Sequence, residues 1–229
     1  MKALIFSPGF VDRRTYQHPY FQRISWLKRY DCFGISLTDP CLSLGDNVGL
    51  GWFIGQGPDH YLRRIADFLN KLIASKGITP DNCMFFGSSA GGFASLGMAT
   101  IVRGSTAYVV NPQTNVFKFH HATELHKTLA VCFHGGDMLA IAAKFHDRCN
   151  LMEFFKVEGY FPNTIFIQNI FDRYHYSEHM IPLLQALPDL NASGRISFHL
   201  VNMPELGHNP PDYDVLRGHF DTFIEEPVR

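Results

Sequence analysis

One segment of the chain carries the residue types of a nucleophilic active site. Residues 83 to 99 read CMFFGSSAGGFASLGMA, an apolar run followed by a Gly- and Ser-rich turn and a run of small residues. Ser89 has Gly87 two positions before it and Gly91 two positions after it, which fits the pattern G-x-S-x-G. In that pattern the chain turns sharply from strand to helix and lifts the central hydroxyl above the sheet. The motif therefore predicts that Ser89 is a nucleophile, and Ser88, without this glycine spacing, is the weaker alternative.

The same turn predicts part of an oxyanion hole. The backbone N–H of Ala90 is expected at the amino terminus of the following helix, where the helix dipole favours negative charge. A second donor is expected from the loop after the first strand, and either Gly9 or Phe10 can supply it. The segment His134-Gly135-Gly136 is similar to an HGG oxyanion motif. We exclude it because such a motif precedes the nucleophile in the chain.

A serine nucleophile needs a base that takes its proton and an acid that holds the base in place. With this turn motif, the acid and then the histidine follow the serine, each on a loop after a later strand. Asp172 follows an expected strand at 164–168, and His208 follows the last expected strand at 195–202. We therefore predict a triad of Ser89, Asp172 and His208. The competing residues that we rank lower are Asp137, Glu178, Asp189, His134, His175 and His179.

Short apolar runs alternate with helical patterns along the whole chain. Strands are expected at 2–6, 32–37, 82–86, 107–110, 164–168 and 195–202, and helices at 60–75, 93–102, 178–186 and 213–224. The helix at 60–75 has apolar residues at helical spacing and is followed by Gly77 and Pro80. Apolar strands that alternate with helices predict an α/β protein, a three-layer α/β/α sandwich around a mostly parallel sheet.

Residues 112–160 form the least regular part of the pattern. Within them, residues 129–134 fit a strand and residues 138–145 fit a helix. The chain has no internal repeat, low-complexity tract or linker, so we expect a single domain over residues 1–229. We interpret 112–160 as a helical cap or insertion in that domain, and we expect substrate specificity to lie there and in the loops around Ser89.

Charge and hydropathy exclude several classes of partner. The 229 residues include 20 Lys and Arg against 21 Asp and Glu, with a formal net charge of -1. Without a basic patch, binding to a nucleic-acid backbone is disfavoured. No apolar run approaches the roughly 20 residues of a membrane span. The short apolar run at the amino terminus does not fit a signal peptide, so we expect a soluble, cytoplasmic protein.

The cysteines and histidines do not predict a metal site or a disulfide framework. There are 5 Cys, an odd number, and no C-x-x-C pair. The 12 His are scattered without an H-E-x-x-H pattern. We therefore expect no metal and interpret most of these residues as buried or surface side chains.

Four segments taken together resemble a known family. They are FFGSSAGGFASL, VVNPQT at 109–114, FIQNIFDRYHY at 166–176 and GHNPP at 207–211. The combination is similar to a branch of the α/β-hydrolase superfamily, the bacterial capsular-polysaccharide and surface-glycan O-acetyltransferases and related serine esterases. The resemblance implies a compact α/β-hydrolase fold, a triad at Ser89, Asp172 and His208, acetyl-CoA as donor and a sugar hydroxyl as acceptor. This chain lacks the early antiparallel strands of the full fold.

These features lead to one main hypothesis and two alternatives. The main hypothesis is acyl transfer through an acyl-Ser89 intermediate, in which an O-acetyl ester of a bacterial surface carbohydrate is made or hydrolysed. The alternatives are a small-molecule carboxylesterase or thioesterase, and a catalytically inactive fold that serves as a binding module. Hydrolysis requires no cofactor, whereas transfer requires acetyl-CoA.

The expected substrate is a small molecule or an oligosaccharide, and the sequence is compatible with a homo-oligomer. Residues expected near the rim of the site are candidates for substrate binding, mostly because aromatic or imidazole rings can stack on a sugar. These candidates are Ser88, Trp52, Tyr174 and His175, together with Phe10.

Overall fold

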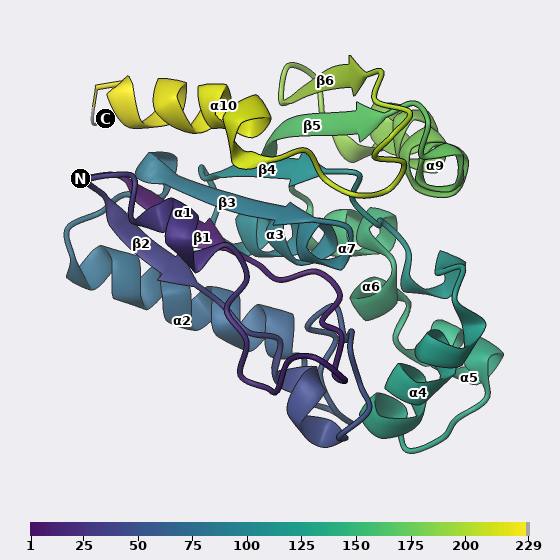
Figure 1. The fold of residues 1–229 in the computed structure, drawn as a ribbon. Coiled ribbons are helices and arrows are strands. Elements are labelled where there is room, and N and C mark those ends of the chain that lie inside the picture. The colour runs from purple at the N-terminus through teal and green to yellow at the C-terminus, as the bar shows by residue number, and fades with distance from the viewer. Residues whose placement is uncertain (228–229) are drawn as a thin grey trace.

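A single parallel sheet forms the centre of the computed structural model, which describes residues 1–227. Its six strands lie in the order β2-β1-β3-β4-β5-β6, and all neighbouring strands are parallel (Figure 1). The strands are β1 Ala3–Phe6, β2 Phe33–Ser36, β3 Cys83–Ser88, β4 Thr106–Val110, β5 Asn163–Asn169 and β6 Ile196–Val201. The expected strands are thus confirmed at all six places, with small shifts at their ends.

Helices cover both faces of the sheet (Figure 1). The α-helices are α1 Ile24–Leu27, α2 Tyr61–Ser75, α3 Ala90–Ile101, α4 Ala122–Phe133, α5 Met138–Lys144, α6 His146–Cys149, α7 Leu151–Glu158, α8 Arg173–His175, α9 Ile181–Ala186 and α10 Tyr213–Glu225. Short 3-10 segments lie at Pro40–Leu44, Pro80–Asn82, Val116–Lys118 and Leu187–Leu190, and a π-helical turn lies at Tyr176–Met180. The predicted three-layer α/β/α architecture is therefore confirmed. None of the described helices is long and apolar enough to cross a membrane.

Alternating side chains divide the core between the two faces of the sheet. In β1, Leu4 and Phe6 pack with α1 and α10, whereas Ala3 and Ile5 pack with α2, α3 and α7. The strand register places Phe6 beside Phe86. The ring of Phe220 from α10 lies 5.6 Å from that of Phe6 and 5.0 Å from that of Phe86. This aromatic cluster fixes α10 to the sheet.

The regular secondary-structure elements between β4 and β5 are all helices. The strand that we predicted at 129–134 is wrong, because these residues belong to α4 and its C-cap. Leu125, Leu129 and Cys132 recur at helical spacing and are all buried, so an amphipathic helix places them on one face. The helix predicted at 138–145 is confirmed as α5.

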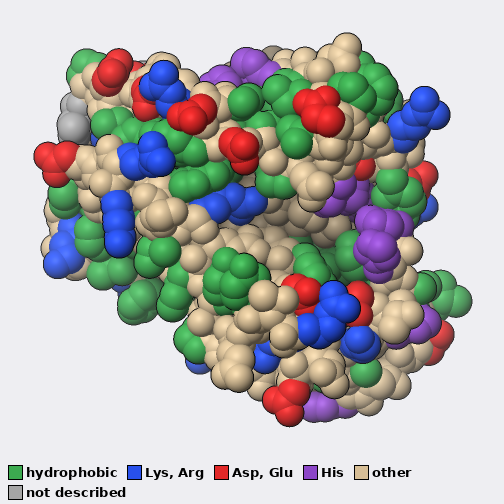
Figure 2. Space-filling model, viewed as in Figure 1, with side chains coloured by type: hydrophobic (Ala, Val, Ile, Leu, Met, Phe, Trp, Pro, Cys, Tyr) green, Lys and Arg blue, Asp and Glu red, His purple; other side chains and the backbone are tan. Residues whose placement is uncertain are grey.

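The parallel strands bring the functional loops to one edge of the sheet. The loops after β1, β3, β4, β5 and β6 all leave from the carboxyl ends of their strands, where open α/β sheets bind ligands. In Figure 1, α4 lies below this edge, and in Figure 2 the surface is hollowed between the sheet and the part that contains α4. The three residues of the predicted triad belong to these loops.

Candidate active site

Ser89 lies in the turn between β3 and α3 and has a strained backbone. Its φ is 54° and its ψ is -121°, a conformation that residues other than glycine rarely adopt. Two backbone hydrogen bonds hold it there: its N–H donates to the carbonyl of Val110 at 3.1 Å, and its carbonyl accepts from the N–H of Gln113 at 3.1 Å. The turn therefore presents a half-buried serine side chain above the sheet.

The glycines of the G-x-S-x-G motif are required by close contacts between backbone segments. A Cβ on Gly87 would collide with the carbonyl of Gly91, and a Cβ on Gly91 would lie 2.5 Å from the carbonyl oxygen of Ser7. The first contact closes the turn around Ser89. The second brings the loop after β1 against the amino terminus of α3. The glycine spacing of the sequence motif thus reflects tight packing on both sides of the serine.

Asp172 and His208 are joined by a short hydrogen bond. Asp172 follows β5 and is buried, whereas His208 lies on the loop after β6 with 35% of its side chain exposed. His208 Nδ1 and Asp172 Oδ2 are 2.6 Å apart. An ionised carboxylate only accepts, so Nδ1 carries the proton and Nε2 is left as a base.

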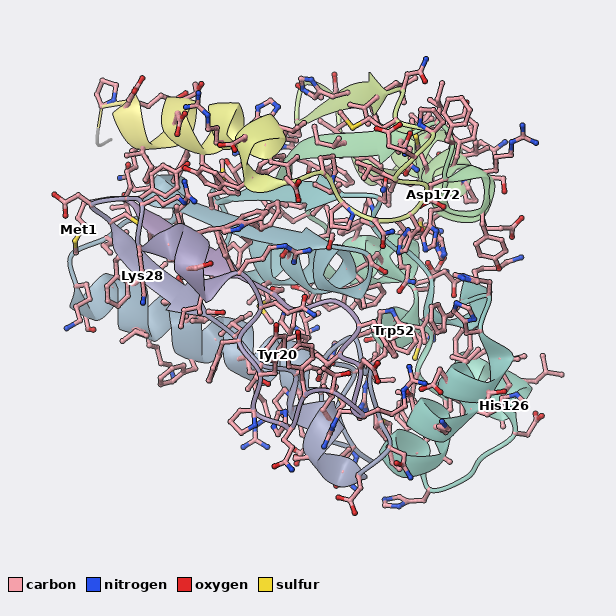
Figure 3. The ribbon with its side chains drawn as sticks, in the orientation of Figure 1. Met1, Tyr20, Lys28, Trp52, His126 and Asp172 are labelled. Carbon is pink, nitrogen blue, oxygen red and sulfur yellow. The ribbon has the colours of Figure 1, made fainter. Side chains whose placement is uncertain are left out.

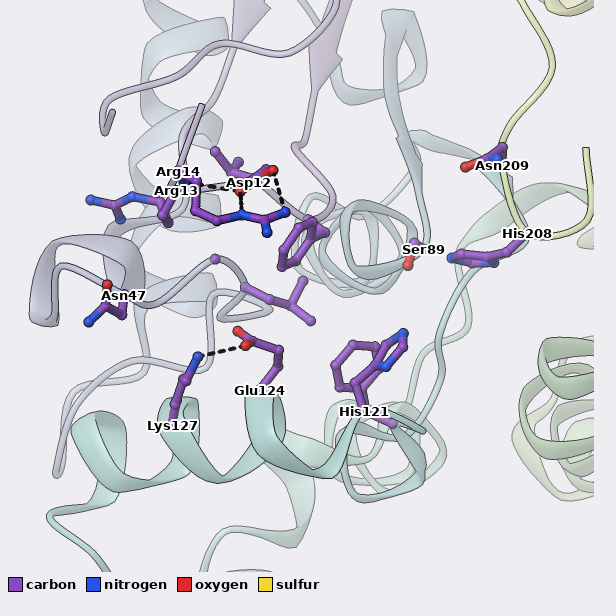
Figure 4. Close-up of a pocket in the computed structure, with 15 residues that line it drawn as sticks. Asp12, Arg13, Arg14, Asn47, Ser89, His121, Glu124, Lys127, His208 and Asn209 are labelled. Atoms are coloured by element: carbon purple, nitrogen blue, oxygen red, sulfur yellow. Dashed lines mark hydrogen bonds and ion pairs between the residues drawn. The ribbon is translucent and has the colours of Figure 1, made fainter. Parts of the chain in front are cut away.

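Ser89 and His208 face each other across the end of a pocket (Figure 4). No hydrogen bond joins their side chains within residues 1–227. Such contacts are often long before a substrate binds and shorten in the reacting complex. Ser89 therefore has the His208 imidazole next to it, and Asp172 is hydrogen-bonded to the far nitrogen of that imidazole.

The second oxygen of Asp172 is occupied by another histidine. His175 Nδ1 lies 2.9 Å from Asp172 Oδ1, and His175 is only 1% exposed. Burial alone would raise the pKa of Asp172, but the hydrogen bonds from His175 and His208 outweigh it and hold this pKa well below its usual range. Asp172 is therefore ionised at neutral pH and held between two imidazoles.

A buried hydrogen-bond chain fixes the protonation of His175. Trp52 Nε1, which can only donate, lies 2.5 Å from Gln113 Oε1, and Gln113 Nε2 lies 3.3 Å from His175 Nε2. Because the amide oxygen of Gln113 is engaged by Trp52, its NH₂ group faces His175, and Nε2 of that ring must accept. His175 is consequently neutral with its proton on Nδ1, directed at Asp172. Burial also lowers the pKa of His175, although Asp172 opposes this shift.

Two asparagines fasten the His208 loop to the ends of the strands. Asn111 Nδ2 donates to the carbonyl of His208 at 3.2 Å, and its Oδ1 accepts from the N–H of Asn169 at 2.7 Å. Asn169 Nδ2 donates to the carbonyls of Met203 and Gly207 at 2.7 and 2.9 Å. The base is thus positioned by side chains from β5 and from the turn after β4.

The sequence analysis did not assign roles to Asn111, Gln113 and Asn169. Asn111 and Gln113 belong to the NPQT segment, and Asn169 belongs to the QN-x-x-D segment, so the family resemblance contained the signal. All three are fully or nearly fully buried polar residues. Their hydrogen bonds, which a single sequence does not reveal, show that these segments hold Asp172 and His208 in place.

The pocket beside Ser89 and His208 has a volume of about 720 Å³. The loop after β1 lines one side of it, and the start of α4 lines another through Glu124, Lys127 and the N-cap residue His121 (Figure 4). Arg13 and Arg14 lie on the side away from Ser89. This volume is typical of a small-molecule binding site.

Comparisons with known proteins agree with the fold described above. No protein-family model and no curated protein matches the chain in sequence. The capsule O-acetyltransferase of Neisseria meningitidis serogroup A matches with a TM-score of 0.75 at 18% identity, over 98% of this chain and 87% of that chain. A mutant of the same enzyme in complex with CoA matches with a TM-score of 0.75 at 16% identity, over 98% and 87%. An S-formylglutathione hydrolase from Agrobacterium tumefaciens matches with a TM-score of 0.60 at 15% identity, over 98% and 83%.

The chain has an α/β-hydrolase fold. The predicted fold class is thereby confirmed, and so is the resemblance to O-acetyltransferases and serine esterases at the level of the fold. At these identities the match does not extend to the activity.

In this hydrolase fold the oxyanion donors are expected beside the serine. The N–H of Ala90 begins α3, next to Ser89. The N–H of Gly9 donates to Gln22 Oε1 at 3.0 Å, so it is already engaged. The N–H of Phe10 has no hydrogen bond within residues 1–227, and Phe10 lines the pocket. We therefore favour Phe10 over Gly9 as the second donor.

The structure places the four other candidate substrate-binding residues outside the pocket lining. Trp52 and His175 are each 1% exposed, so their rings are not available to stack on a sugar. Ser88 is buried, and its hydroxyl accepts from Arg23. Tyr174 is 37% exposed, but its hydroxyl donates to the carbonyl of Lys118. We do not retain these four residues as substrate contacts; Trp52 and His175 support Asp172 instead.

Asp172, His175 and His208 also have ligand atoms close enough together to suggest a metal site. The Nδ1–O distances of 2.9 and 2.6 Å are, however, those of direct hydrogen bonds. Ligands that surround one ion at about 2 Å would stand farther apart than this. The cluster is better described as a carboxylate that accepts from two imidazoles.

Proposed function

We propose that this protein is a serine-dependent acyl-transfer enzyme in which Ser89, Asp172 and His208 form the catalytic triad. The observation that carries the proposal is the 2.6 Å hydrogen bond between Asp172 and His208, at the pocket end where Ser89 is held in a strained turn. Strained backbone at a pocket, a base and an ionised acid are the components that activate a serine hydroxyl.

The reaction would proceed through an acyl-enzyme. His208 Nε2 takes the proton of Ser89 Oγ as that oxygen bonds to the acyl carbon, and the N–H groups of Ala90 and Phe10 bind the resulting oxyanion. His208 then gives its proton to the leaving group, and the acyl group remains on Ser89. Asp172 stays ionised and stabilises the imidazolium that forms.

The second half of the reaction distinguishes transfer from hydrolysis. We propose that a carbohydrate hydroxyl attacks the acyl-Ser89 ester, with acetyl-CoA as the acyl donor. The fold match to a capsule O-acetyltransferase, one structure of which contains CoA, supports this choice. The residues present fit such a donor through Arg13, which lines the pocket away from Ser89 and has no carboxylate partner within residues 1–227, so it could hold a phosphate group (Figure 4).

We also propose that the chain is one domain in which residues 112–160 act as a helical cap. Two residues of α4, Glu124 and Lys127, and its N-cap residue His121 line the pocket, so this segment covers the site opposite the strand ends. In that position α4 would exclude water and orient the acceptor.

A fluorophosphonate probe tests the nucleophile directly. The adduct mass should map to Ser89, and Ser89→Ala should remain unlabelled, whereas Ser88→Ala, the neighbouring serine variant, should still be labelled. Wild-type protein that is not labelled would contradict the proposal. Acetyl-CoA with and without an oligosaccharide then separates transfer from hydrolysis: free acetate without any acetylated sugar would leave an esterase or thioesterase.

A further inference from the structure

A second, smaller hollow adjoins the pocket along the loop after β1. Its volume is about 360 Å³, and it shares Phe10, Val11 and Asp12 with the lining of the pocket beside Ser89. The remaining lining residues are Tyr16, Tyr20, Gln22 and Arg23. We call this second hollow the tyrosine hollow. The proposed acyl-transfer mechanism does not use the tyrosine hollow.

Arg23 brings into this hollow a positive charge that no carboxylate balances within residues 1–227. Its Nη2 donates to Ser88 Oγ at 2.9 Å and its Nη1 to Gln22 Oε1 at 3.4 Å, both neutral acceptors. The rings of Trp26 and Phe86 lie 5.5 and 5.7 Å from its guanidinium. A guanidinium has five N–H donors, so most of its donors remain for a ligand.

The backbone of Arg23 is also unusual. Its φ is 59° and its ψ is 17°, the left-handed region that residues other than glycine seldom adopt. This conformation turns the chain immediately before α1 and brings the guanidinium to Ser88, the neighbour of the nucleophile. Burial lowers the pKa of Arg23 to about 10, so the side chain stays protonated at neutral pH.

The other charged side chains around the two hollows are largely paired. Arg14 lies 3.0 Å from Asp12, and Lys127 lies 2.7 Å from Glu124. These two pairs contribute no net charge. Arg13 donates to two backbone carbonyls, so its charge adds to the positive excess. The region beside Ser89 is therefore locally positive in a chain whose formal net charge is -1.

Aromatic rings complete the tyrosine hollow. The rings of Tyr16 and Tyr20 stack with centroids 4.2 Å apart, and Tyr16 is 43% exposed. Phe10, where the two hollows meet, is 49% exposed. Tyr20 lies in the long loop that follows β1 (Figure 3). Such a site suits a ligand with two parts. The guanidinium can bind an acid group, and the aromatic rings can pack on the apolar face of a ligand ring.

We propose that the tyrosine hollow binds an anionic sugar as the acyl acceptor, with its carboxylate or phosphate at Arg23 and its ring against Tyr16, Tyr20 or Phe10. The inference rests on the proposed function in taking a sugar as the acceptor. A hydroxyl of the bound sugar attacks the acyl carbon and gives its proton to His208 Nε2. The new ester bond forms as the bond to Ser89 Oγ breaks, and Oγ regains the proton from His208.

The test measures binding on the Ser89→Ala protein and so does not depend on catalysis. Glucuronate is titrated against its uncharged methyl ester, and glucose 6-phosphate against glucose, with NMR or calorimetry as the readout. At least one acid should bind about tenfold more tightly than its neutral partner, as expected for a charge-assisted hydrogen bond. Whichever pair shows the difference identifies carboxylate or phosphate as the acid group. Equal affinities within both pairs would overturn the proposal.

Variants of Arg23 locate the site. Arg23→Gln keeps a donor for Ser88 but should abolish the preference for the acid, whereas Arg23→Lys keeps the charge and should retain part of it. Arg29→Gln is the matched control. Arg29 lies in the same segment as Arg23, is exposed and packs on Tyr213, so its loss should leave the preference for the acid unchanged. A preference that survives Arg23→Gln would contradict the assignment.

Titration with CoA separates acceptor from donor. If Arg23→Gln weakens CoA binding while sugar-acid binding is unchanged, the guanidinium holds a donor phosphate, and the acceptor assignment is wrong. If only the sugar acid is affected, the assignment stands. Circular dichroism of each variant checks that the fold is retained, and Arg23→Lys provides the comparison if Arg23→Gln does not fold.

Discussion

The imidazole rings of His175 and His208 stack 3.8 Å apart and nearly parallel, with an interplanar angle of 13°. Both rings point their Nδ1 atoms at the carboxylate of Asp172, one at each oxygen. They nevertheless differ in surroundings, since His175 is buried and His208 has 35% of its side chain exposed. His208 lines the pocket, where the proposed mechanism has it exchange protons with the substrate, whereas the Nε2 of His175 faces Gln113.

His175 is therefore a positioning residue in the proposed mechanism. It donates to Asp172, so the carboxylate cannot rotate freely away from His208, and its ring supports one face of the His208 ring. The donated hydrogen bond also makes the carboxylate less basic. In the proposed mechanism these effects change how well His208 acts as a base, which the pH profile of the reaction reports.

The first prediction concerns His175→Phe, which keeps an aromatic face for His208 but removes the donor to Asp172. The carboxylate becomes more basic, so it stabilises the protonated form of His208 more strongly. We expect kcat/KM for p-nitrophenyl acetate to fall by about tenfold at neutral pH, the effect of losing about 1.4 kcal/mol. The acid limb of the pH profile should move to higher pH.

The matched control for this variant is His146→Phe, which changes an exposed histidine on α6. Its profile should coincide with that of the wild type. A His175→Phe profile with unchanged limbs would show that His175 has only a packing role.

The second prediction concerns Gln113→Glu, which replaces the amide NH₂ group that faces His175 with an acceptor. Nε2 of His175 then has to carry a proton in order to make a hydrogen bond, so the ring becomes an imidazolium beside Asp172. A positive charge on the ring that stacks on His208, with ring centroids 3.8 Å apart, disfavours the protonated form of His208. The acid limb should therefore move to lower pH, opposite to the shift expected for His175→Phe.

Gln113→Leu serves as the comparison for Gln113→Glu, because it removes the bonds of the amide without adding a charge. Nitrogen chemical shifts of the His175 ring should show a doubly protonated imidazole in Gln113→Glu alone. Equal pH profiles in the two variants would contradict the hydrogen-bond directions that we assign to Trp52, Gln113 and His175.

The sequence predicted the triad because each of its members obeys a local rule. Ser89 lies in a motif whose glycines are fixed by close contacts, and Asp172 and His208 each follow an apolar strand of recognisable pattern. The structure brings all three to one edge of the sheet, since parallel strands place their carboxyl ends together. Their roles as nucleophile, acid and base belong to the proposal that the labelling experiment tests.

The features that the sequence did not predict depend on contacts between distant segments. Gln113 and His175 are 62 residues apart, and Trp52 and Gln113, which belong to the same hydrogen-bond chain, are 61 residues apart. A buried histidine three residues after Asp172 looks, in sequence, like a competing base or a sugar-binding ring. Likewise, the sequence does not distinguish Gly9 from Phe10 as the second oxyanion donor, because the hydrogen bond from the Gly9 N–H to Gln22 is a contact between separate parts of the loop.

The third prediction compares two glycines, Gly91 and Gly218. A Cβ on Gly91 would lie 2.5 Å from the carbonyl oxygen of Ser7, whereas nothing lies within 4 Å of a Cβ on Gly218 in α10. Gly91→Ala should lower the free energy of unfolding by about 2 kcal/mol, as overpacked sites do, and should abolish labelling of Ser89. Gly218→Ala should raise it by about 0.5–1 kcal/mol through helix propensity. Urea unfolding measures the free energy of unfolding of both variants. A Gly91→Ala protein that is active and as stable as the wild type would contradict the packing argument.

The fourth prediction concerns stability in mild acid and follows from His179. This ring is fully buried, its Nδ1 accepts from the N–H of Thr114 at 3.1 Å, and burial lowers its pKa to about 3. Below pH 6.5 the unfolded chain binds a proton at this position that the folded protein does not bind, so stability is lost as the pH falls toward the folded pKa. At pH 5 the loss from one such residue is about 2 kcal/mol relative to pH 7.

His179→Asn should remove this part of the pH dependence, because the Oδ1 of Asn can accept from Thr114 but does not titrate. The variant should be less stable than the wild type at pH 7, since the ring packing is lost, yet its free energy of unfolding should change less between pH 7 and pH 5. His146→Asn, an exposed histidine, should retain the wild-type slope because its surroundings are similar in both states. If the slopes for wild type and His179→Asn are equal, protonation of His179 is not what destabilises the folded protein in acid.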